Sequence, residues 1–440
     1  MARNSRTRRV SKATQRSGQL PWELVRLGDY SYVKARIGWR GLTAAEYTDS
    51  GPYLIAGNHI RGSEIAWDLC DHLSVERFEE SSEIILQEGD IIVSKDGTIG
   101  RCAHVDTLPG PATINGTMML VRPAAKHFHS RFVYHYFQGH EFRRLVEEKI
   151  SGGTVPHLFQ RDIVQLRIPK PSISEQRKIA QILDSIEQII SRTRAVIEQT
   201  RRLKTALLQN LLTNGLPGMH RGFRKHPALG RIPHCWKCLS IDELATKDPR
   251  SIQSGPFGSS LLHSEFGSEG VLVIGIDNVL DGRFSIGAEH RIRPEKFNEL
   301  KKYQARPSDV LITVMATVGR CCVVPENLEP ALITKHVYRI AVDQSLCLPD
   351  FLMWNVLANP HVSRQLYGNA QGQTRDGLNG QSIRRLRIPI PPLEEQRVIV
   401  RTVDAIQGRE DQESKNLNQL SIVKSGLSAA LLDGRIRVRR

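Results

Sequence analysis

One junction occurs twice in this chain, and the repetition constrains the fold more than any other feature. The segment LRIPKPSISEQRKIAQILDSI begins at Leu166 and LRIPIPPLEEQRVIVRTVDAI begins at Leu386, so the copies lie 220 residues apart in a chain of 440. Eleven of the 21 paired positions are identical. A period of this length is too long for a solenoid of short repeats. We therefore expect two similar, domain-sized units.

The similarity continues upstream of the junction. GDIIVSKDGTIGRCAHV, from Gly89, pairs with SDVLITVMATVGRCCVV, from Ser308, with six identities in 17 positions. Each segment is a short β-branched run, a polar turn and a second run, which predicts a tight pair of strands. Because Ala316 stands where the first copy has Gly97, we expect the two turns to differ in shape.

Each junction predicts a final strand followed at once by a helix. Proline cannot donate to a β-ladder and disfavours helix in the residue before it, so LRIPKP reads as the end of a strand. Ser172 and Glu175 then form a predicted capping box at the start of the helix. In the second copy Pro392 replaces the serine, which a first helical turn tolerates, and Glu395 is retained. We interpret both glutamates as capping residues rather than catalytic ones.

Both predicted helices are long and carry one narrow apolar stripe. The first runs from about 172 to 213, some 42 residues, or roughly 60 Å at 1.5 Å per residue. A helix with such a stripe has no globular core of its own, so the two are expected to pack on each other as an antiparallel coiled coil. The alternative is that each lies on a separate domain. The polar segment 407–416 with Gly408 and Gly426 puts the continuity of the second helix in question.

The predicted fold class is α+β, with two tandem α+β domains separated by two long helices and related by an internal repeat of about 220 residues. We expect a basic tail (1–16), a first domain (17–171), a spacer helix (172–214), a second domain (215–391), a second spacer helix (392–434) and a basic tail (435–440).

The charge of the chain points to a polyanionic partner. The net charge is +15 and the pI is about 9.7, and neutralising phosphates releases counterions and drives association. No strongly amphipathic basic helix suggests a membrane surface, and no apolar run approaches the ~18–20 residues that span a bilayer. The N-terminus lacks the apolar core of a secretory signal. Nucleic acid is therefore the favoured partner, and we expect a cytoplasmic protein without membrane association.

The seven cysteines indicate no disulfide framework. One spacing, Cys235-x-x-Cys238, has His220, His226 and His234 nearby. A zinc site would need a second pair at suitable spacing, and the histidines are scattered. We interpret these cysteines as buried thiols rather than metal ligands.

Several motifs of nucleic-acid enzymes are missing. The sequence has no GxxxxGK[ST] phosphate loop, no GxGxxG after a strand, and no Asn/Asp-Pro-Pro-Tyr/Phe segment that would hold an extruded base. Glu147, Glu148 and Lys149 have nuclease-like spacing, but they lie in a charged helical stretch and are read as a solvated face. We expect a binding subunit with no catalytic residues, no metal and no cofactor.

Candidate DNA contacts lie in the polar turns and in the polar loops before the final strands (151–162 and 370–382). Arginine, lysine, glutamine and asparagine read base edges, and basic or hydroxyl groups hold phosphates. The loops differ in sequence while their flanks match, as one scaffold reading two different half-sequences requires. The candidates are Lys95, Thr98, Arg101, Thr154, His157, Gln160, Arg161, Thr317, Arg320, Lys335, Gln373, Thr374, Arg375, Asn379 and Gln381.

The doubled LRIPxPxxxEQR junctions, the long helices behind them and the helix ends LLQNLLTNG and LSAALLDG resemble the specificity (S) subunits of type I restriction–modification enzymes. The resemblance covers residues 20–434. It implies two target-recognition domains, each reading one half of a bipartite site in double-stranded DNA. It also implies that the helices act as a ruler between the half-sites.

By the same resemblance, the helices bind two DNA-methyltransferase (M) subunits, and restriction/translocase (R) subunits join the complex. These partners carry S-adenosylmethionine, methyl transfer, ATP hydrolysis and cleavage. The predicted subunit-interface residues are Ile179, Leu183, Ile186, Leu207, Leu211, Ile399, Val403, Leu420, Leu427 and Leu431. Two alternatives stay open: a stand-alone DNA-binding or scaffold protein, and a recognition chain that itself cuts or methylates.

Overall fold

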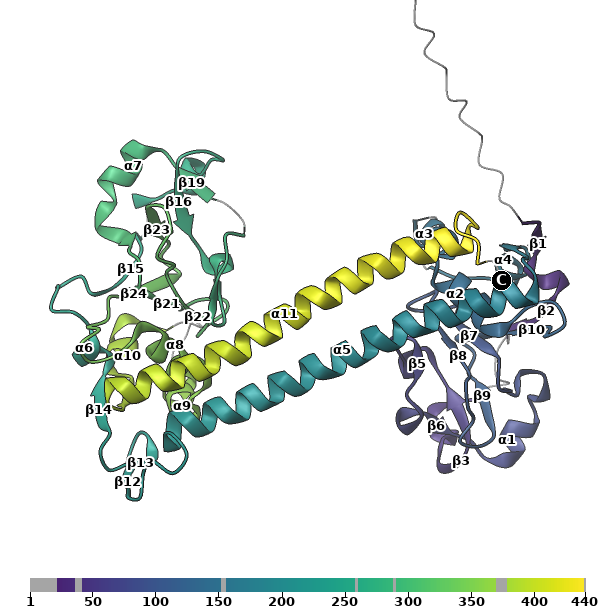
Figure 1. Ribbon diagram of the computed structural model, residues 1–440, viewed down its shortest axis with the longest axis horizontal. Coiled ribbons are helices and arrows are strands. Elements are labelled where there is room, and N and C mark those ends of the chain that lie inside the picture. Colours follow the sequence, from purple (N-terminus) through teal and green to yellow (C-terminus); the bar gives the residue numbers. More distant parts are fainter. Residues whose placement is uncertain are drawn as a thin grey trace, which may run out of the picture. The chain divides into compact units, whose positions relative to one another are not determined.

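The computed structural model describes residues 22–35, 42–151, 156–257, 260–287, 290–368 and 378–438 (Figure 1). The chain divides into two compact units. The first unit comprises residues up to Arg194 together with residues from Asn416 onward, and the second comprises Ala195–Lys415. Each long helix therefore contributes one part to each unit. Among the described residues, no helix is both long and apolar enough to cross a lipid bilayer.

The first unit is built on two small sheets. An antiparallel sheet has the strand order β2-β10-β7-β8, and a second sheet has the order β6-β3-β9, in which β3 and β9 run parallel. Short pairs β1-β11 and β4-β5 complete it. The strands are β1 (Leu24–Arg26), β2 (Ser31–Ala35), β3 (Thr48–Ile55), β4 (Ile60–Arg61), β5 (Glu64–Ile65), β6 (Asp71–His72), β7 (Ile91–Ser94), β8 (Cys102–His104), β9 (Ala112–Ile114), β10 (Met118–Pro123) and β11 (Arg167–Pro169).

The β7 strand shows how this unit is packed. Successive side chains of a strand point to opposite faces, so Ile91 and Val93 enter one apolar core and Ile92 enters another. The first of these cores is closed by helical side chains, among them Phe132. The helices of this unit are α1 (Val75–Glu79), α2 (Ser130–Gln138), α3 (His140–Ser151) and α4 (Gln160–Val164).

The second unit repeats this arrangement. Its antiparallel sheet has the order β15-β24-β21-β22, and its second sheet has the order β19-β16-β23-β20 with β16 and β23 parallel. Its strands are β12 (Phe223–His226), β13 (Gly230–Pro233), β14 (Lys237–Ser240), β15 (Ile252–Ser254), β16 (Val271–Ile274), β17 (Val279–Leu280), β18 (Arg283–Phe284), β19 (His290–Ile292), β20 (Gln304–Ala305), β21 (Val310–Thr313), β22 (Cys321–Val323), β23 (Ala331–Ile333), β24 (Val337–Ile340) and β25 (Arg387–Ile390). Its helices are α6 (Ile241–Leu244), α7 (Pro294–Glu299), α8 (Pro349–Ala358), α9 (Pro360–Gly368) and α10 (Gly380–Arg385).

The long helices are α5 (Ile173–Asn214) and α11 (Leu393–Leu432). In the second unit Arg201 Nε bonds Glu410 (2.6 Å), and Lys204 Nζ bonds Gln407 (2.7 Å). Moving three residues toward the C-terminus of α5 thus corresponds to moving three residues toward the N-terminus of α11, as antiparallel helices require. In the first unit Lys424 pairs with a glutamate of α5, Glu187. The polar segment 407–416 is helical throughout, so the interruption considered for α11 does not occur.

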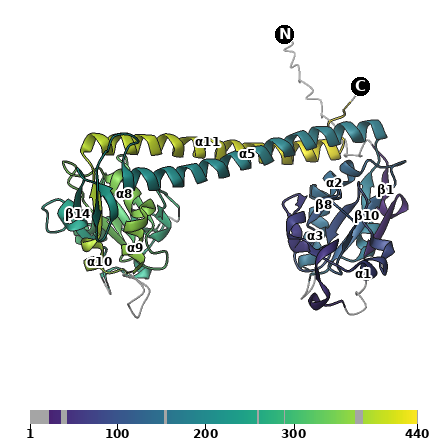
Figure 2. The same cartoon turned by 90° about the horizontal axis from the view of Figure 1, so that it is seen from below.

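In each unit a short helix packs between the antiparallel sheet and a long helix (Figure 2). The apolar core around α2 in the first unit includes Ile179 and Leu183 of α5. The core around α8 in the second unit includes Ile399 and Val403 of α11. The first turns of the long helices are therefore part of the globular cores.

The junction in the first unit is fixed by one buried glutamine. Gln176, which is fully buried, accepts the backbone N–H of His129 (2.8 Å). Its amide nitrogen donates to the carbonyl oxygens of His127 (3.1 Å) and Pro171 (2.9 Å). One side chain thereby ties the start of α5 both to the segment before α2 and to the end of β11.

The second unit repeats this joint. Gln396 accepts the backbone N–H of Leu348 (2.9 Å) and donates to the carbonyl oxygens of Leu346 (3.0 Å) and Pro391 (2.9 Å). The repeated glutamine of the EQR motif is therefore a joint between each globular domain and its helix.

The repeated glutamates make a different contact from the one we expected. Ser172 Oγ accepts the backbone N–H of Glu175 (3.3 Å), which is half of the predicted capping box. The carboxylate of Glu175 instead accepts two bonds from Arg437 (2.7 and 3.0 Å), whose guanidinium also lies over the Trp22 ring. Arg437 belongs to the predicted basic tail, and this ion pair holds it against α5.

In the second unit Glu395 is 2% exposed and has several partners. Its carboxylate lies 2.7 Å from His220 Nε2 and accepts the indole N–H of Trp236 (3.1 Å) and the backbone N–H of Leu216 (3.2 Å). Both glutamates therefore bind the start of one long helix to the segment that follows the other.

Candidate nucleic-acid interface

The polar turn of the first unit connects β7 to β8 and is braced by one hydroxyl. Ser94 Oγ donates to the carbonyl oxygen of Thr98 (2.6 Å) and accepts the backbone N–H of Arg101 (2.9 Å). Gly97 and Gly100 have φ values of 70° and 82°, which glycine adopts without a steric penalty. The exposed side chains of Thr98 and Arg101 are thus presented from a fixed backbone.

The corresponding turn of the second unit has the same bracing. Thr313 Oγ1 donates to the carbonyl oxygen of Thr317 and accepts the backbone N–H of Arg320 (3.0 Å). Ala316 has a φ of 61°, so it adopts the left-handed conformation of Gly97. The expected difference in shape is therefore wrong. The turn keeps its shape although a Cβ there costs roughly 1–2 kcal/mol.

Each turn lies against the loop that precedes the final strand of its unit. The backbone N–H of Leu158 donates to the carbonyl oxygen of Lys95 (3.0 Å), and the N–H of Leu378 donates to that of Val314 (3.0 Å). The sequence identified the two segments separately, and these long-range bonds bring them together. We call the described side chains of the turn and of the adjoining loop in each unit the turn–loop surface.

Charge on the turn–loop surface of the first unit is partly neutralised. Asp96 accepts a bond from Lys95 Nζ (2.8 Å) and contacts His157 Nδ1. Partial burial raises the pKa of Asp96, but the bonds from Lys95 and His157 outweigh it and hold this pKa below its ordinary value. The carboxylate is therefore ionised, and Lys95 is a weaker attractor of phosphate than its type suggests.

An aromatic residue that the sequence reading missed is central to this surface. Phe159 is 44% exposed. Its ring lies 4.4 Å from the His157 ring and 4.5 Å from the guanidinium of Arg161. Aromatic faces contact bases and thymine methyl groups. The signal that could have found it is an aromatic residue directly before two polar candidates, Gln160 and Arg161, in a candidate loop.

Two candidates have their hydrogen-bonding groups occupied by the protein itself. Gln160 accepts the backbone N–H of Ala35 (3.0 Å) and donates to the carbonyl oxygen of Val33 (3.0 Å), so its amide secures β2. Asn379 caps α10 by accepting the N–H of Ser382 (2.8 Å). We leave both out of the proposed interface because base contact would break these bonds.

The remaining candidates of the second unit differ in exposure. Lys335 and Gln381 are exposed, and Arg320 is half-buried. Thr317 Oγ1 is buried without a hydrogen-bond partner among the described residues. Four candidates lie outside the described residues: Thr154, Gln373, Thr374 and Arg375.

Most of the predicted subunit-interface residues are used inside the chain. Six of them are buried in the globular cores, namely Ile179, Leu183, Leu211, Ile399, Val403 and Leu431. The other four are half-buried: Ile186, Leu207, Leu420 and Leu427. Because the ends of the helices pack on the domains, we leave these six side chains out of the proposed partner surface. The helices expose other apolar side chains, notably Leu203 and Ile422 at 63% and 73%.

The cysteine and histidine cluster does not have the geometry of a zinc site. Cys235 Sγ lies 3.5 Å from His220 Nδ1, and Cys238 Sγ lies 4.0 Å from His226 Nδ1, so the thiols point to different histidines. The expectation of buried thiols is also wrong, since Cys235 is exposed and Cys238 is half-buried.

Three other side chains lie close enough together to be considered as metal ligands. Ligand atoms of His135, Asp184 and Glu187 lie within 4.8 Å of one another. His135 Nε2 is already bonded to Asp184 (2.7 Å). Arg131 also lies 3.4 Å from Asp184, and Lys424 pairs with Glu187. These cations balance the carboxylates, so the group is an ion-pair network between α2 and α5.

The three residues of α3 with nuclease-like spacing lie at the surface of the first unit. Glu147 and Glu148 are exposed, in agreement with a solvated face. Lys149 is half-buried and pairs with Asp162 (2.8 Å). This ion pair connects α3 to α4.

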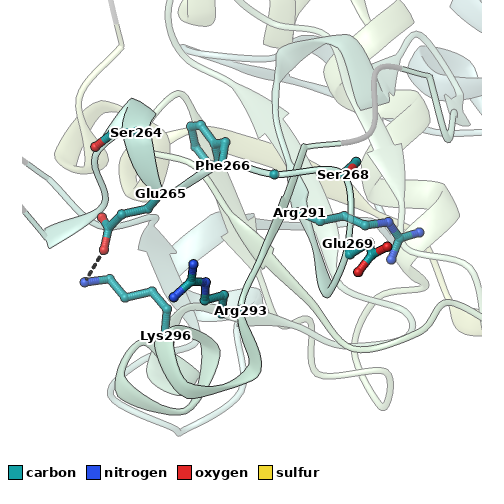
Figure 3. Close-up of a pocket in the computed structure, with 9 residues that line it drawn as sticks. Ser264, Glu265, Phe266, Ser268, Glu269, Arg291, Arg293 and Lys296 are labelled. Atoms are coloured by element: carbon teal, nitrogen blue, oxygen red, sulfur yellow. Dashed lines mark ion pairs between the residues drawn. The ribbon is translucent and has the colours of Figure 1, made fainter.

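A hollow of about 570 Å³ lies beside β19 and α7 in the second unit (Figure 3). Glu265 and Lys296 form an ion pair across it (2.9 Å), and Arg291 lies 3.8 Å from Glu329. Its acidic and basic groups thus largely balance each other, so it is a weak candidate for a polyanion.

Comparison with known proteins gives the family. The sequence profile of the type I restriction modification DNA specificity domain matches residues 20–199 and 272–421. The type I restriction enzyme MjaVIII specificity subunit of Methanocaldococcus jannaschii is 23% identical over 436 residues, which cover 95% of this chain and 93% of that protein. The EcoBI specificity subunit of Escherichia coli is 25% identical over 354 residues, which cover 78% and 72%.

The fold is also shared with solved structures. The type I restriction–modification S subunit from M. genitalium has a TM-score of 0.59 at 14% identity, covering 95% of this chain and 98% of that one. The family profile covers most of the chain and matches both repeats. This chain therefore belongs to the family of type I restriction–modification specificity subunits.

Proposed function

We propose that this chain selects the DNA sequence for a type I restriction–modification complex. Its two recognition domains, 17–171 and 215–391, each read one half of a bipartite double-stranded site. The observation that carries the proposal is the turn–loop surface, whose turns are braced by the same bonds in both units but carry different side chains. The readers are Thr98, Arg101, Phe159 and Arg161 in the first unit, and Arg320, Lys335 and Gln381 in the second.

Electrostatic attraction and base contacts have separate roles in this proposal. The net charge of +15 supplies sequence-independent affinity for phosphates. Discrimination comes from side chains at base edges, at about 1–3 kcal/mol for each good bidentate pair. The guanidinium of Arg161 lies over the Phe159 ring at 4.5 Å, a contact that restricts its motion and leaves its planar fork for bidentate recognition.

We further propose that exposed apolar side chains of the helices bind the methyltransferase subunits. In the first unit Ile189, Ile422 and Val423 are 48%, 73% and 56% exposed, and in the second Val196 and Leu203 are 37% and 63% exposed. Large apolar side chains that are exposed on a helix become buried when a partner binds there, which favours association. Methyl transfer, ATP hydrolysis and cleavage then belong to the partners, and this chain contributes binding alone.

The test of sequence selection is to co-express the chain with its methyltransferase and map methylated adenines. The native complex should give a two-part motif with a fixed gap. Arg161→Ala should relax positions in one part only, and Arg320→Ala positions in the other part only. Arg202→Ala, at an exposed residue of α5, is the control and should leave the motif unchanged. A contiguous motif, or relaxation of both parts by one substitution, would contradict the proposal.

The test of partner binding is co-purification with the methyltransferase. Leu203→Glu and Ile422→Glu should each reduce recovery of the partner at least tenfold, because a charge would be buried in the contact. Gln209→Glu, at an exposed position of α5, should have no effect. Equal recovery with all three variants would exclude this surface.

A further inference from the structure

The second unit contains a strongly basic pocket that the proposed base readers do not include. It has a volume of about 630 Å³. Its charged lining consists of one acid and five bases, namely Asp248, Arg250, Lys301, Lys302, Arg306 and Arg339. The pocket lies where β21 begins, next to Asp309, whereas the turn–loop surface follows the end of β21 at Thr313.

The positive charge of the pocket is balanced only in part, by Asp248 in its lining and by Asp309 beside it. In the part of the chain that the structure describes, Arg250, Lys301, Lys302 and Arg306 form no ion pair with a carboxylate. Asp248 uses a carboxylate oxygen to accept the backbone N–H of Arg250 (2.8 Å). Converging like charges in a recess create a focused positive potential that favours a bound anion.

A buried arginine forms one wall. Arg339 is 3% exposed and donates to the carbonyl oxygens of Gln304 (3.0 Å) and Arg250 (2.7 Å). Its contact with Asp309 is a single bond of 3.3 Å, and its Nε has no partner among the described residues. Buried polar groups are normally satisfied, so this guanidinium has donor capacity left over.

The first unit has the same backbone at the equivalent place. The N–H of Gln87 bonds Asp90 (2.7 Å), as the N–H of Arg306 bonds Asp309 (2.7 Å). The N–H of Ala124 bonds the carbonyl oxygen of Tyr30, as that of Ala341 bonds Ser251. These matching hydrogen bonds align the two halves residue by residue, and the alignment does not depend on similar side chains.

The side chains at those positions are reversed in charge or neutral. Four bases of the second unit, Arg250, Lys301, Lys302 and Arg306, correspond to Asp29, Ser82, Glu83 and Gln87 in the first. The buried arginine differs as well. Arg122 forms two bonds with Asp90 (2.6 and 2.7 Å), so its Nε is satisfied. The pocket is thus a specific addition to the second half.

We propose that this pocket binds a phosphate group and that the first half lacks the site. We infer that this phosphate belongs to the backbone of the DNA held by the second recognition domain, an inference that rests on the proposed function. The four residues of β21 span about 13 Å, so a duplex on the turn–loop surface can reach the pocket within one helical turn of about 34 Å. A free phosphate compound has the same chemistry and is the other source to be tested.

The first experiment replaces three basic residues of the pocket by the residues at the equivalent positions of the first half. A triple variant of the full chain, Lys301→Ser, Lys302→Glu and Arg306→Gln, takes the residues of the first half. Binding of a duplex with the recognised site and of an unrelated duplex is measured over a range of salt concentrations. Both affinities should fall about 10- to 100-fold, and the salt dependence should be weaker by about one phosphate contact. The control is Arg177→Ser, Arg409→Glu and Lys415→Gln, which makes the same change in net charge on the helices.

The second experiment titrates the native chain and the triple variant with inorganic phosphate by calorimetry, without DNA. If the native chain binds inorganic phosphate, the triple variant does not, and the triple variant also loses DNA affinity as described, then the pocket and its DNA-backbone ligand are both established. If the native chain binds inorganic phosphate but the triple variant binds DNA as well as the native chain does, the pocket is established. Its ligand is then a free phosphate compound and not the DNA backbone. No phosphate binding with unchanged DNA affinity, or an equal loss in the control, overturns the pocket. Failure of the two-part motif would overturn the proposed function and leave phosphate binding intact.

Discussion

The two halves of this molecule keep the same internal joints and present different surfaces. Gln176 and Gln396 each make three hydrogen bonds to equivalent backbone groups. Around them the surface chemistry diverges, and Glu83 in one half corresponds to Lys302 in the other. Buried polar networks tolerate change poorly because a lost partner leaves an unsatisfied group. Exposed positions carry no such penalty, so recognition can vary on a constant frame.

Backbone shape is also retained where the residue types are not suited to it. Gly89 and Gly97 of the first half correspond to Ser308 and Ala316 of the second, and all four have positive φ. The bracing hydroxyls of Ser94 and the equivalent threonine hold the turn. Hydrogen bonds from one hydroxyl to the backbone of the turn therefore keep its shape even where glycine is replaced.

The largest expected effect tests whether the joints are equivalent. Gln176→Ala and Gln396→Ala should each lower the free energy of unfolding of their own half by about 3 kcal/mol, because three buried backbone groups lose their partner. Hydrogen exchange of each half measures this. Gln209→Ala, at an exposed position of α5, should change stability by less than about 0.5 kcal/mol. Clearly unequal losses would show that the halves do not share one joint.

A second prediction concerns pH and the weaker arginine–aspartate pair of the second half. Burial raises the pKa of Asp309 from 3.8 to about 6, against the opposing charges of Arg339 and Arg306. The folded state therefore holds this proton more tightly than the unfolded state. Stability of the second half should fall by on the order of 2 kcal/mol as the pH rises from about 4 to about 6.

The measurement is denaturant unfolding across that pH range, followed with a probe in the second half. Asp309→Asn should remove this part of the pH dependence while still accepting the backbone N–H of Arg306. A variant with the same slope as the native chain would assign the dependence to other groups.

A third prediction separates apolar base contact from electrostatics in the first half. Phe159→Ala should weaken binding of the recognised duplex about tenfold, because an apolar contact with a thymine methyl group in the groove is lost. The salt dependence should not change, since no charge is removed. Equal weakening on an unrelated duplex would mean that Phe159 supports the loop rather than reading a base.

The smallest expected effect comes from exchanging the turn residues. Gly97→Ala should destabilise the first half by about 1 kcal/mol, and Ala316→Gly should stabilise the second by a similar or smaller amount. A Cβ on Gly97 meets no atom within 4 Å, so backbone strain is the only change. Shifts of the same sign in both variants, measured by unfolding of each half, would contradict the shared left-handed shape.

The sequence predicted the elements whose signals are local or repeated. The period of the repeat, the final strands at Arg167 and Arg387, and the two long helices follow from residue patterns within short windows. The profile match confirms the family, and the solved structure shares the fold. Of the candidate interface, the sequence identified the two segments in each half, because polar turn residues between matching flanks are visible without a structure.

Only the tertiary structure decided which of those residues face outward and which segments meet. The bond from Leu158 to Lys95 spans more than sixty positions, and the amide of Gln160 reaches β2 across 127 residues. The heptad residue Ile179 belongs to a domain core rather than to a partner surface. Such contacts depend on how elements pack, which no local pattern encodes. The repeat therefore fixed the frame, and packing determined which side chains remain free to bind.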